Sequence, residues 1–172
     1  MADQATIRAI VERNIELLAL KPARGHLTRA TRARLVAGLR CEIEEGPWKL
    51  FADMPGKAGG EDTAPTPGML GRGALAGCLT IGIAIWAARL GVSVDAVEVE
   101  VQADFDARGE LGMGQVTPGY TEVRYVVSID SPASRQELDE LLALVERHSP
   151  YLDVFGREVA LRRVLHVNGV EA

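Results

Sequence analysis

The sequence predicts an α+β domain in which antiparallel strands and helices occupy separate parts of the chain. The main observation is an apolar segment at residues 67–90, which is too long for a strand and has no charged side chain between Arg72 and Arg89. It is followed by two runs of alternating apolar and polar residues, 94–105 and 120–130, which are typical of neighbouring strands with one solvent-exposed face. Paired strands with helices segregated from them indicate the α+β class.

The composition argues against several classes of function. The 172 residues suit one domain, and the net charge of −5 argues against a nucleic-acid-binding surface, which requires a basic face. The polar N-terminus lacks the pattern of a signal peptide, so we expect a cytoplasmic protein. The three histidines lie far apart and the two cysteines lack zinc-site spacing, so we expect no metal and no cofactor.

The first half of the chain leads into the apolar segment. Apolar residues at helical spacing predict an amphipathic helix over residues 4–20, ended by Pro22, within an N-terminal extension at 1–28 that precedes the main domain at 29–172. Residues 31–44 and 48–52 together predict a β-hairpin. The following stretch, 55–67, is rich in Gly, Pro and Thr and predicts a loop.

Residues 67–90 predict the central helix. Thr66 is a suitable N-cap, Pro67 a suitable first helical residue, and Gly91 a suitable end. The uncharged run at 73–88 is shorter than the roughly 20 residues of a membrane span. Because apolar residues occur all round the helix, we expect it to be covered on every side. One chain of this length is not enough to cover such a helix, so we expect a homodimer. A stripe of small residues would let another helix approach closely; it comprises Gly73, Gly77, Ala84 and Ala88.

The last part of the chain predicts a helix and a strand. The Ser131-Pro132 pair resembles a cap and first turn, and spaced leucines carry the helix to about His148. The helix breaks at Ser149-Pro150, a short further turn follows at 151–155, and residues 158–167 predict a final strand.

Several motifs together resemble the OsmC/Ohr family of osmotically inducible and organic-hydroperoxide-resistance proteins. These are the residues DMP at 53–55, the loop GGEDTAPTP at 59–67, Leu70, and the small-residue helix leading to Cys78. The helix end RHSP at 147–150 lies where the family often has Cys-Pro. The resemblance covers roughly residues 30–167.

The resemblance implies an OsmC-like fold, in which antiparallel sheets wrap long central helices in an intertwined homodimer. It also implies a thiol peroxidase site, with Cys78 at the position of the cysteine that the peroxide oxidises. Ser149 stands where the family's resolving cysteine would be, and Gly68 where its helix-start glutamate would be. The family arginine belongs to an early loop, for which the candidates are Arg32, Arg34 and Arg40.

The two cysteines each have two interpretations. A thiol reduces peroxides only as the thiolate, which needs a cation, a helix N-terminus or a hydrogen-bond donor nearby. Cys78 lies beyond the first turn of its helix, so activation would come from another segment or subunit; otherwise it is a small buried residue. Cys41 either resolves an oxidised Cys78 or packs in a core. Ser149 either hydrogen-bonds near the site or caps a helix, and we expect His148, its neighbour in the sequence, to border the thiol pocket.

Three functions remain open. In the first, Cys78 reduces a small apolar hydroperoxide, and Cys41 or an external thiol completes the cycle. In the second, the pocket has lost the groups expected at Gly68 and Ser149 and binds a small apolar molecule without turnover. In the third, the protein is a structural stress protein without a specific pocket. We expect neither a nucleic-acid nor a membrane partner.

Overall fold

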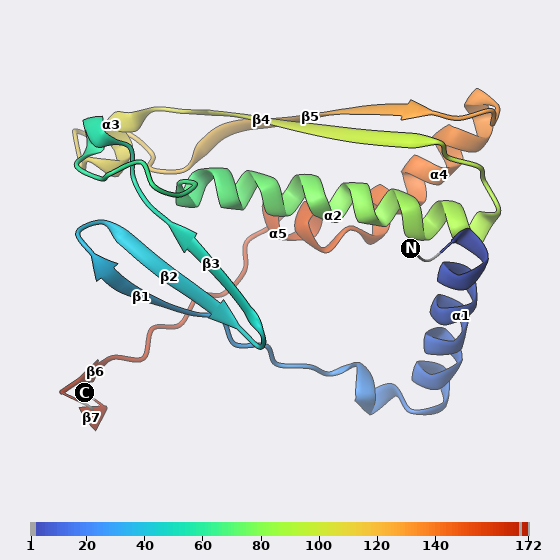
Figure 1. Cartoon of the computed structure of the whole chain (residues 1–172), viewed down its shortest axis with the longest axis horizontal. Helices are drawn as coiled ribbons and strands as arrows, with labels where there is room; N and C mark the ends of the chain where they lie inside the picture. The colour runs from blue at the N-terminus through green and yellow to red at the C-terminus, as the bar shows by residue number, and fades with distance from the viewer. Residues whose placement is uncertain (1–2, 169, 172) are drawn as a thin grey trace.

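A long helix, α2 (Pro67–Leu90), runs through the centre of the computed structural model, which describes residues 3–168 and 170–171 (Figure 1). Thr66 caps its N-terminus, with Oγ1 accepting a hydrogen bond from the Met69 amide at 3.2 Å. Gly91 ends the helix with a left-handed φ of 73°, a conformation that glycine adopts without strain. Both predicted ends of the central helix are confirmed.

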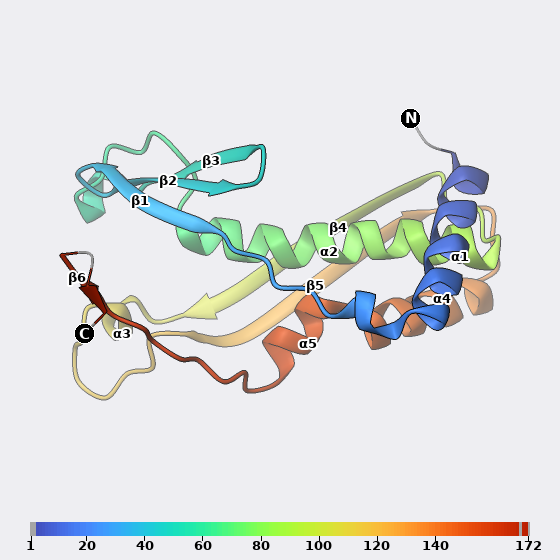
Figure 2. The ribbon, with the colours of Figure 1, turned by 90° about the horizontal axis from the view of Figure 1, so that it is seen from below.

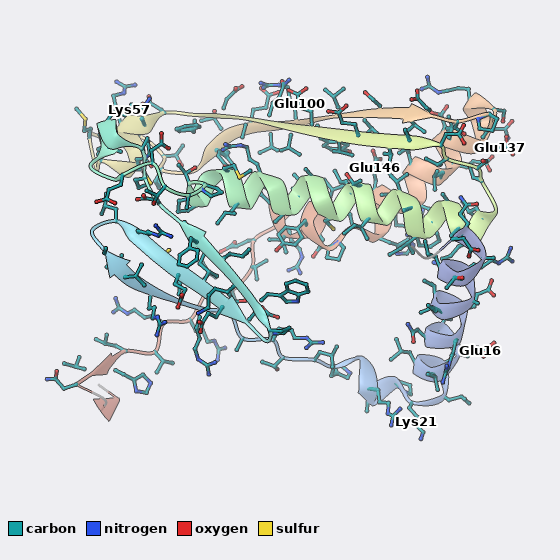
Figure 3. All side chains as sticks on the ribbon, viewed as in Figure 1. Glu16, Lys21, Lys57, Glu100, Glu137 and Glu146 are labelled. Carbon is teal, nitrogen blue, oxygen red and sulfur yellow. The ribbon has the colours of Figure 1, made fainter. Side chains whose placement is uncertain are left out.

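A two-stranded ribbon covers α2 along one side. β4 (Ala96–Phe105) and β5 (Tyr120–Asp130) pair antiparallel, and the connection between them contains the short helix α3 (Ala107–Glu110). Alternate residues of β4 are half-buried, as the sequence pattern predicts. Figure 3 shows Glu100 on the face of the ribbon that points away from α2. The inward residues of the ribbon pack on the buried leucines and isoleucine of α2.

Two helices after the ribbon complete the core. α4 (Arg135–His148) lies against α2, and α5 (Pro150–Gly156) follows it directly (Figures 1 and 2). The core comprises Leu75, Leu79, Ile83, Ala87, Val92, Leu141 and Val145. The predicted start of α4 at Ser131-Pro132 is wrong. Ser134 forms a capping box with Glu137, while the Ser131 hydroxyl donates to the Ser93 carbonyl and so stabilises the preceding turn.

One face of α2 is left open by the rest of the chain. Ile81 is 63% exposed, and a Cβ placed at Gly73 or Gly77 would meet nothing within 4 Å. The expectation that α2 is covered on every side is therefore not met within one chain. By length and composition α2 could cross a membrane. Its buried residues Leu75, Leu79, Ile83 and Ala87 form part of the core of this chain.

The N-terminal helix lies across the C-terminal end of α2. α1 (Gln4–Leu20) is capped by Asp3, and the short 3-10 helix η1 (Pro22–Gly25) begins at the predicted terminator, Pro22. Gln4 Nε2 donates to the Val92 carbonyl at 2.8 Å. None of the α1 residues is buried. The predicted helix is confirmed, and it lies on the outside of the chain (Figure 2).

The segment predicted as one hairpin forms three strands. β1 (Arg32–Ala37), β2 (Arg40–Glu45) and β3 (Trp48–Ala52) make an antiparallel sheet, because a turn at Gly38 divides the predicted 31–44 segment. The register places small and apolar side chains together on one face: Ala33, Leu35, Cys41, Ile43, Leu50 and Ala52. Leu35 and Leu50 are exposed there, so the chain leaves much of this face uncovered.

The predicted final strand at 158–167 is wrong. Residues 157–165 form no strand, and only β6 (His166–Val167) pairs, with β7 (Val170–Glu171). Leu161 is 95% exposed. An alternating apolar segment becomes a strand only when a neighbouring edge accepts its hydrogen bonds, and the described part of the chain offers none along 157–165.

Candidate functional site

Two residues far apart in the sequence meet beside α2. Cys78 lies midway along α2, and Ser149 lies at the junction of α4 and α5. The Cys78 sulfur is 3.5 Å from the Ser149 Oγ. Ser149 is only 6% exposed, whereas Cys78 is half-buried. The structure therefore brings together the two positions that the resemblance singles out.

Ser149 also caps α5. Its Oγ accepts a hydrogen bond from the Leu152 amide at 3.3 Å, as the capping interpretation predicts. A hydroxyl has one hydrogen to donate and two lone pairs, so the cap leaves that hydrogen available to the sulfur of Cys78. The two interpretations of Ser149 are thus compatible. Within the described part of the chain, Ser149 is the one side chain recorded at hydrogen-bonding distance from this sulfur.

A pocket of about 230 Å³ opens beside the thiol. It is mainly apolar, and the polar groups on its lining side chains besides the thiol are the Ser149 hydroxyl, the His148 imidazole and the Trp86 indole N–H. It is lined by Cys78, Ile81, Gly82, Ile85, Trp86, Val145, His148, Ser149 and Pro150. Such a pocket is suited to a small apolar molecule whose reacting atom faces the sulfur.

His148 borders the pocket, as predicted, and is held in a stack. Its ring lies 5.0 Å from the Trp86 ring, with 23° between the ring planes. The Arg89 guanidinium lies 3.9 Å from the centre of the same indole. The contact of Arg89 with Trp86 is a cation–π interaction, so this arginine is placed against the ring rather than on the sulfur.

The other candidate residues lie in the N-terminal sheet. Cys41 lies in β2 opposite Leu35 and Ala52, and none of the pocket residues comes from β1, β2 or β3. Arg34 forms an ion pair with Glu42. Arg40 packs over the Phe51 ring at 4.5 Å and donates to Thr63 Oγ1 at 3.3 Å. Within one chain these side chains do not line the pocket with Cys78.

Gly68 lies at the start of α2, where its carbonyl contacts a tyrosine side chain and the residue has no carboxylate of its own. The Tyr120 hydroxyl donates to the Gly68 carbonyl at 3.2 Å and accepts from the Arg72 guanidinium at 3.2 Å. These contacts join β5 to the first turns of α2. They could not be predicted from the sequence, because Tyr120 and Gly68 are separated by the whole of α2 and β4.

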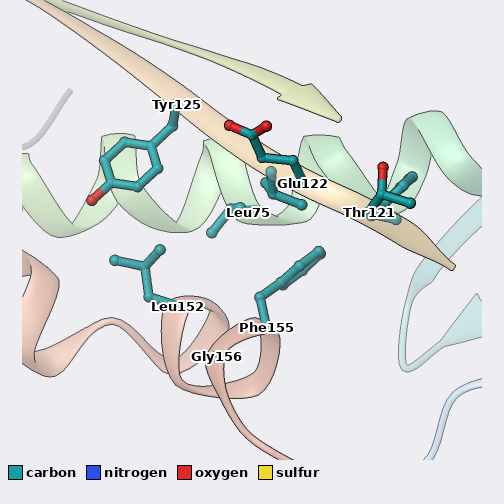
Figure 4. A pocket seen from close by; sticks show the side chains of 9 residues that line it. Leu75, Thr121, Glu122, Tyr125, Leu152, Phe155 and Gly156 are labelled. Carbon is teal, nitrogen blue, oxygen red and sulfur yellow. The ribbon is translucent and has the colours of Figure 1, made fainter. Parts of the chain in front are cut away.

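A second cavity, of about 340 Å³, lies between β5 and α5 (Figure 4). Tyr125, Leu152 and Phe155 face into it, together with Leu75 from α2. Burial raises the pKa of Tyr125 to about 12, and the hydrogen bond to Glu146 adds to this effect. The cavity is the larger of the two, but it has neither thiol nor imidazole among its lining residues. The Cys78 pocket is therefore the candidate reactive site.

In the described residues, no group of three or more His, Cys, Asp or Glu side chains is close enough together to hold a metal ion. The loop before α2 is instead organised around the buried carboxylate of Asp53. Hydrogen bonds from the Thr63 amide and hydroxyl hold the pKa of Asp53 below its usual value.

Comparisons with solved structures find the same fold. An OsmC-like protein from Mycoplasma pneumoniae superposes with a TM-score of 0.65 at 16% identity, over 76% of this chain and 88% of that one. An organic hydroperoxide resistance protein OsmC from Legionella pneumophila gives 0.56 at 22% identity, over 75% and 89%. An organic hydroperoxide resistance protein from Elizabethkingia anophelis, with thiocyanate bound, gives a TM-score of 0.56 at 17% identity, over 75% of this chain and 88% of that one.

The sequence comparisons agree with the structural ones. No curated protein sequence matches the chain. The family model for OsmC-like proteins matches residues 59–162, which include α2, the β4–β5 ribbon, α4, α5 and both Cys78 and Ser149. Because this match spans more than half of the chain, the protein belongs to the OsmC-like protein family.

Proposed function

We propose that the protein is a thiol-dependent peroxidase that reduces small organic hydroperoxides in defence against oxidative stress. The observation that carries this proposal is the position of Cys78, whose sulfur lies beside a mainly apolar pocket and 3.5 Å from a buried hydroxyl. Structural neighbours from Legionella pneumophila and Elizabethkingia anophelis are named as organic hydroperoxide resistance proteins, which supports it.

The chemistry needs only the thiolate and a bound hydroperoxide. The sulfur attacks one oxygen of the O–O bond, that bond breaks, and the second oxygen leaves as an alkoxide that takes a proton from water. The cysteine becomes a sulfenic acid. The apolar lining from Ile81, Ile85, Trp86 and Val145 favours a hydroperoxide with a carbon group over hydrogen peroxide, because burial of that group contributes binding energy.

The proposal includes a homodimer, which supports the pocket by covering the open surfaces. One chain leaves two surfaces partly uncovered. They are the open face of α2 at Gly73, Gly77 and Ile81, and the apolar face of the β1–β3 sheet. A second copy of the chain would bury both kinds of surface. We place the dimer in the cytoplasm. Analytical ultracentrifugation should show a dimer in solution, and a monomer at micromolar concentration would contradict the proposed homodimer.

A second candidate is a binding protein without turnover. It is favoured by two features of the same pocket: Gly68 offers no carboxylate, and Ser149 offers no second thiol. Such a protein would hold a small apolar molecule beside Cys78. Its signature would be a rise in melting temperature on adding an apolar alcohol, such as cumyl alcohol, without consumption of the matching hydroperoxide.

Steady-state consumption of hydroperoxide separates the two candidates. The purified protein is supplied with dithiothreitol and either cumene hydroperoxide or hydrogen peroxide, and the remaining peroxide is measured over time. We expect turnover that is faster with cumene hydroperoxide and absent in Cys78→Ser. Consumption by wild type equal to that by Cys78→Ser would refute the peroxidase and favour the binding protein.

A further inference from the structure

We propose that Ser149 makes this pocket a single-cysteine centre. The Ser149 hydroxyl donates a hydrogen bond to the Cys78 sulfur, and the oxidised sulfur is then reduced by a small thiol from solution instead of by a second cysteine of the chain. This inference rests on the proposed peroxidase function and specifies its reductant. In this role Ser149 is a positioning residue, since it orients and stabilises the reacting sulfur without exchanging electrons with it.

The backbone fixes Ser149 on both sides. Its amide donates to the Glu146 carbonyl at 3.5 Å at the end of α4, and its carbonyl accepts from the Asp153 amide at 3.1 Å in α5. Its Oγ accepts from the Leu152 amide at 3.3 Å. With the residue only 6% exposed, these contacts hold Oγ against the Cys78 sulfur.

The hydrogen-bond inventory sets the direction of the contact. A thiolate has no hydrogen to give, so once Cys78 is ionised the donor between the two atoms must be the Ser149 hydroxyl. Hydrogen bonds to charged acceptors are roughly twice as strong as those to neutral ones. Ser149 therefore stabilises the attacking thiolate and the sulfenate that follows it more than it stabilises the neutral thiol.

Within the described part of one chain, the same geometry leaves the oxidised sulfur without a disulfide partner. The Ser149 side chain, 3.5 Å from it, ends in a hydroxyl, which cannot form a disulfide, and Cys41 lies in β2 among residues that do not line the pocket. His148, which lines the pocket, is exposed and lies outside the open face of α2 that the dimer would cover, so it leaves access for a small molecule. A thiol of low molecular mass fits this access.

The resulting cycle balances with two external thiols. Cys78 thiolate, the hydroperoxide and a proton from water give the sulfenic acid and an alcohol. A first thiol attacks the sulfenic sulfur, forming a mixed disulfide and releasing water. A second thiol attacks that disulfide, which returns the Cys78 thiol and releases the disulfide of the two small thiols. One hydroperoxide is reduced and two thiols are oxidised.

The first arm of the test converts the contact into a crosslink. A disulfide forms only between two cysteines whose side chains and backbones lie close together. The distance of 3.5 Å from the Ser149 Oγ to the Cys78 Sγ shows that these two side chains are close. Treatment with diamide, which needs no peroxidase activity, should give Ser149→Cys an internal disulfide, seen as the loss of two hydrogens in the intact mass. The same loss should occur in Ser149→Cys combined with Cys41→Ser. If neither variant crosslinks, the placement of Ser149 is wrong.

The second arm follows wild-type protein after one equivalent of cumene hydroperoxide. We expect a sulfenic acid at Cys78 that dimedone traps, equally in wild type and Cys41→Ser, and a mixed disulfide after addition of β-mercaptoethanol. An internal Cys41–Cys78 disulfide in wild type would overturn the single-cysteine cycle. Resistance of Cys78 to the hydroperoxide, with crosslinking of Ser149→Cys intact, would instead refute the proposed function and with it the cycle.

The third arm tests the hydrogen bond itself. Alkylation of Cys78 by iodoacetamide at pH 7 should be about tenfold slower in Ser149→Ala, with its pH profile moved upward, because a charge-assisted hydrogen bond is lost. Ser149→Thr keeps the hydroxyl and should restore both the rate and the profile. Circular dichroism first establishes that each variant is folded. An unchanged pH profile in folded Ser149→Ala would overturn the role of the hydroxyl.

Discussion

In the loop that leads into α2, Gly60 lies against the backbone of Met54, and a single methyl group at Gly60 should disrupt this packing. A Cβ at Gly60 would lie 1.9 Å from the Met54 carbonyl oxygen and 2.5 Å from its carbon. Both of these are backbone atoms, so no side chain can turn aside to relieve the overlap. In Gly60→Ala the backbone segments at Met54 and at residue 60 must move apart by more than an ångström.

The expected cost follows from the contacts on either side. Separation breaks the hydrogen bond from the Asp62 amide to the Met54 carbonyl, at 3.1 Å, and withdraws the Glu61 amide from the Asp53 carboxylate. Overpacking costs about 1–3 kcal/mol and each of the two lost hydrogen bonds about 1 kcal/mol, which gives about 3–5 kcal/mol. For a chain of this length, the melting temperature should fall by roughly 6–20 °C.

Thermal unfolding followed by circular dichroism measures this effect, with Gly56→Ala as the matched control. Gly56 lies in the same loop, and a Cβ there would meet nothing within 4 Å. Gly56→Ala should therefore stay within about 0.5 kcal/mol of wild type. Equal melting temperatures for the two variants would refute the close approach at Gly60.

Three further changes test other parts of the structure. Leu141 lies on α4 and is fully buried in the core that α4 shares with α2. Leu141→Ala should lower the free energy of unfolding, measured in urea, by about 2–5 kcal/mol, and a loss below about 1 kcal/mol would contradict its core position. The pKa of Asp53 lies below its usual value of 3.8, so the ionised carboxylate stabilises the fold above that pH, and this stabilisation is lost as the pH falls through the lowered pKa of the folded state. Asp53→Asn should therefore be less stable than wild type at pH 7 and should lack this contribution to the loss of stability in acid. An identical urea midpoint at pH 7 would contradict the role of the carboxylate. Gly77→Leu should cost the proposed dimer about 1–3 kcal/mol by overpacking its interface, and an unaltered melting temperature would place that interface elsewhere.

The sequence predicts those elements whose signals are local. Thr66, Pro67 and Gly91 mark both ends of α2, because capping depends on residues within one turn of the helix end. The alternation in β4 and β5 predicts their buried faces in the same way. Local signals also explain the error at Ser131, since a Ser-Pro pair resembles a cap equally well when its hydroxyl stabilises a turn.

Elements that depend on distant partners could not be predicted in this way. Residues 158–167 alternate like a strand, but they form one only with a neighbouring edge. The contact between Cys78 and Ser149 joins residues 71 positions apart, and only the resemblance to the OsmC/Ohr family pointed to both. The openness of α2 at Ile81 likewise depends on where the rest of the chain packs.

The most direct test of the account is the oxidation of Cys78 by stoichiometric hydroperoxide. Intact mass and peptide mapping follow wild type, Cys78→Ser and Cys41→Ser after cumene hydroperoxide or hydrogen peroxide. A reactive thiol beside a mainly apolar pocket predicts rapid addition of one oxygen at Cys78, faster with the organic peroxide and absent in Cys78→Ser. Oxidation no faster than that of free cysteine would show that Cys78 serves only in packing.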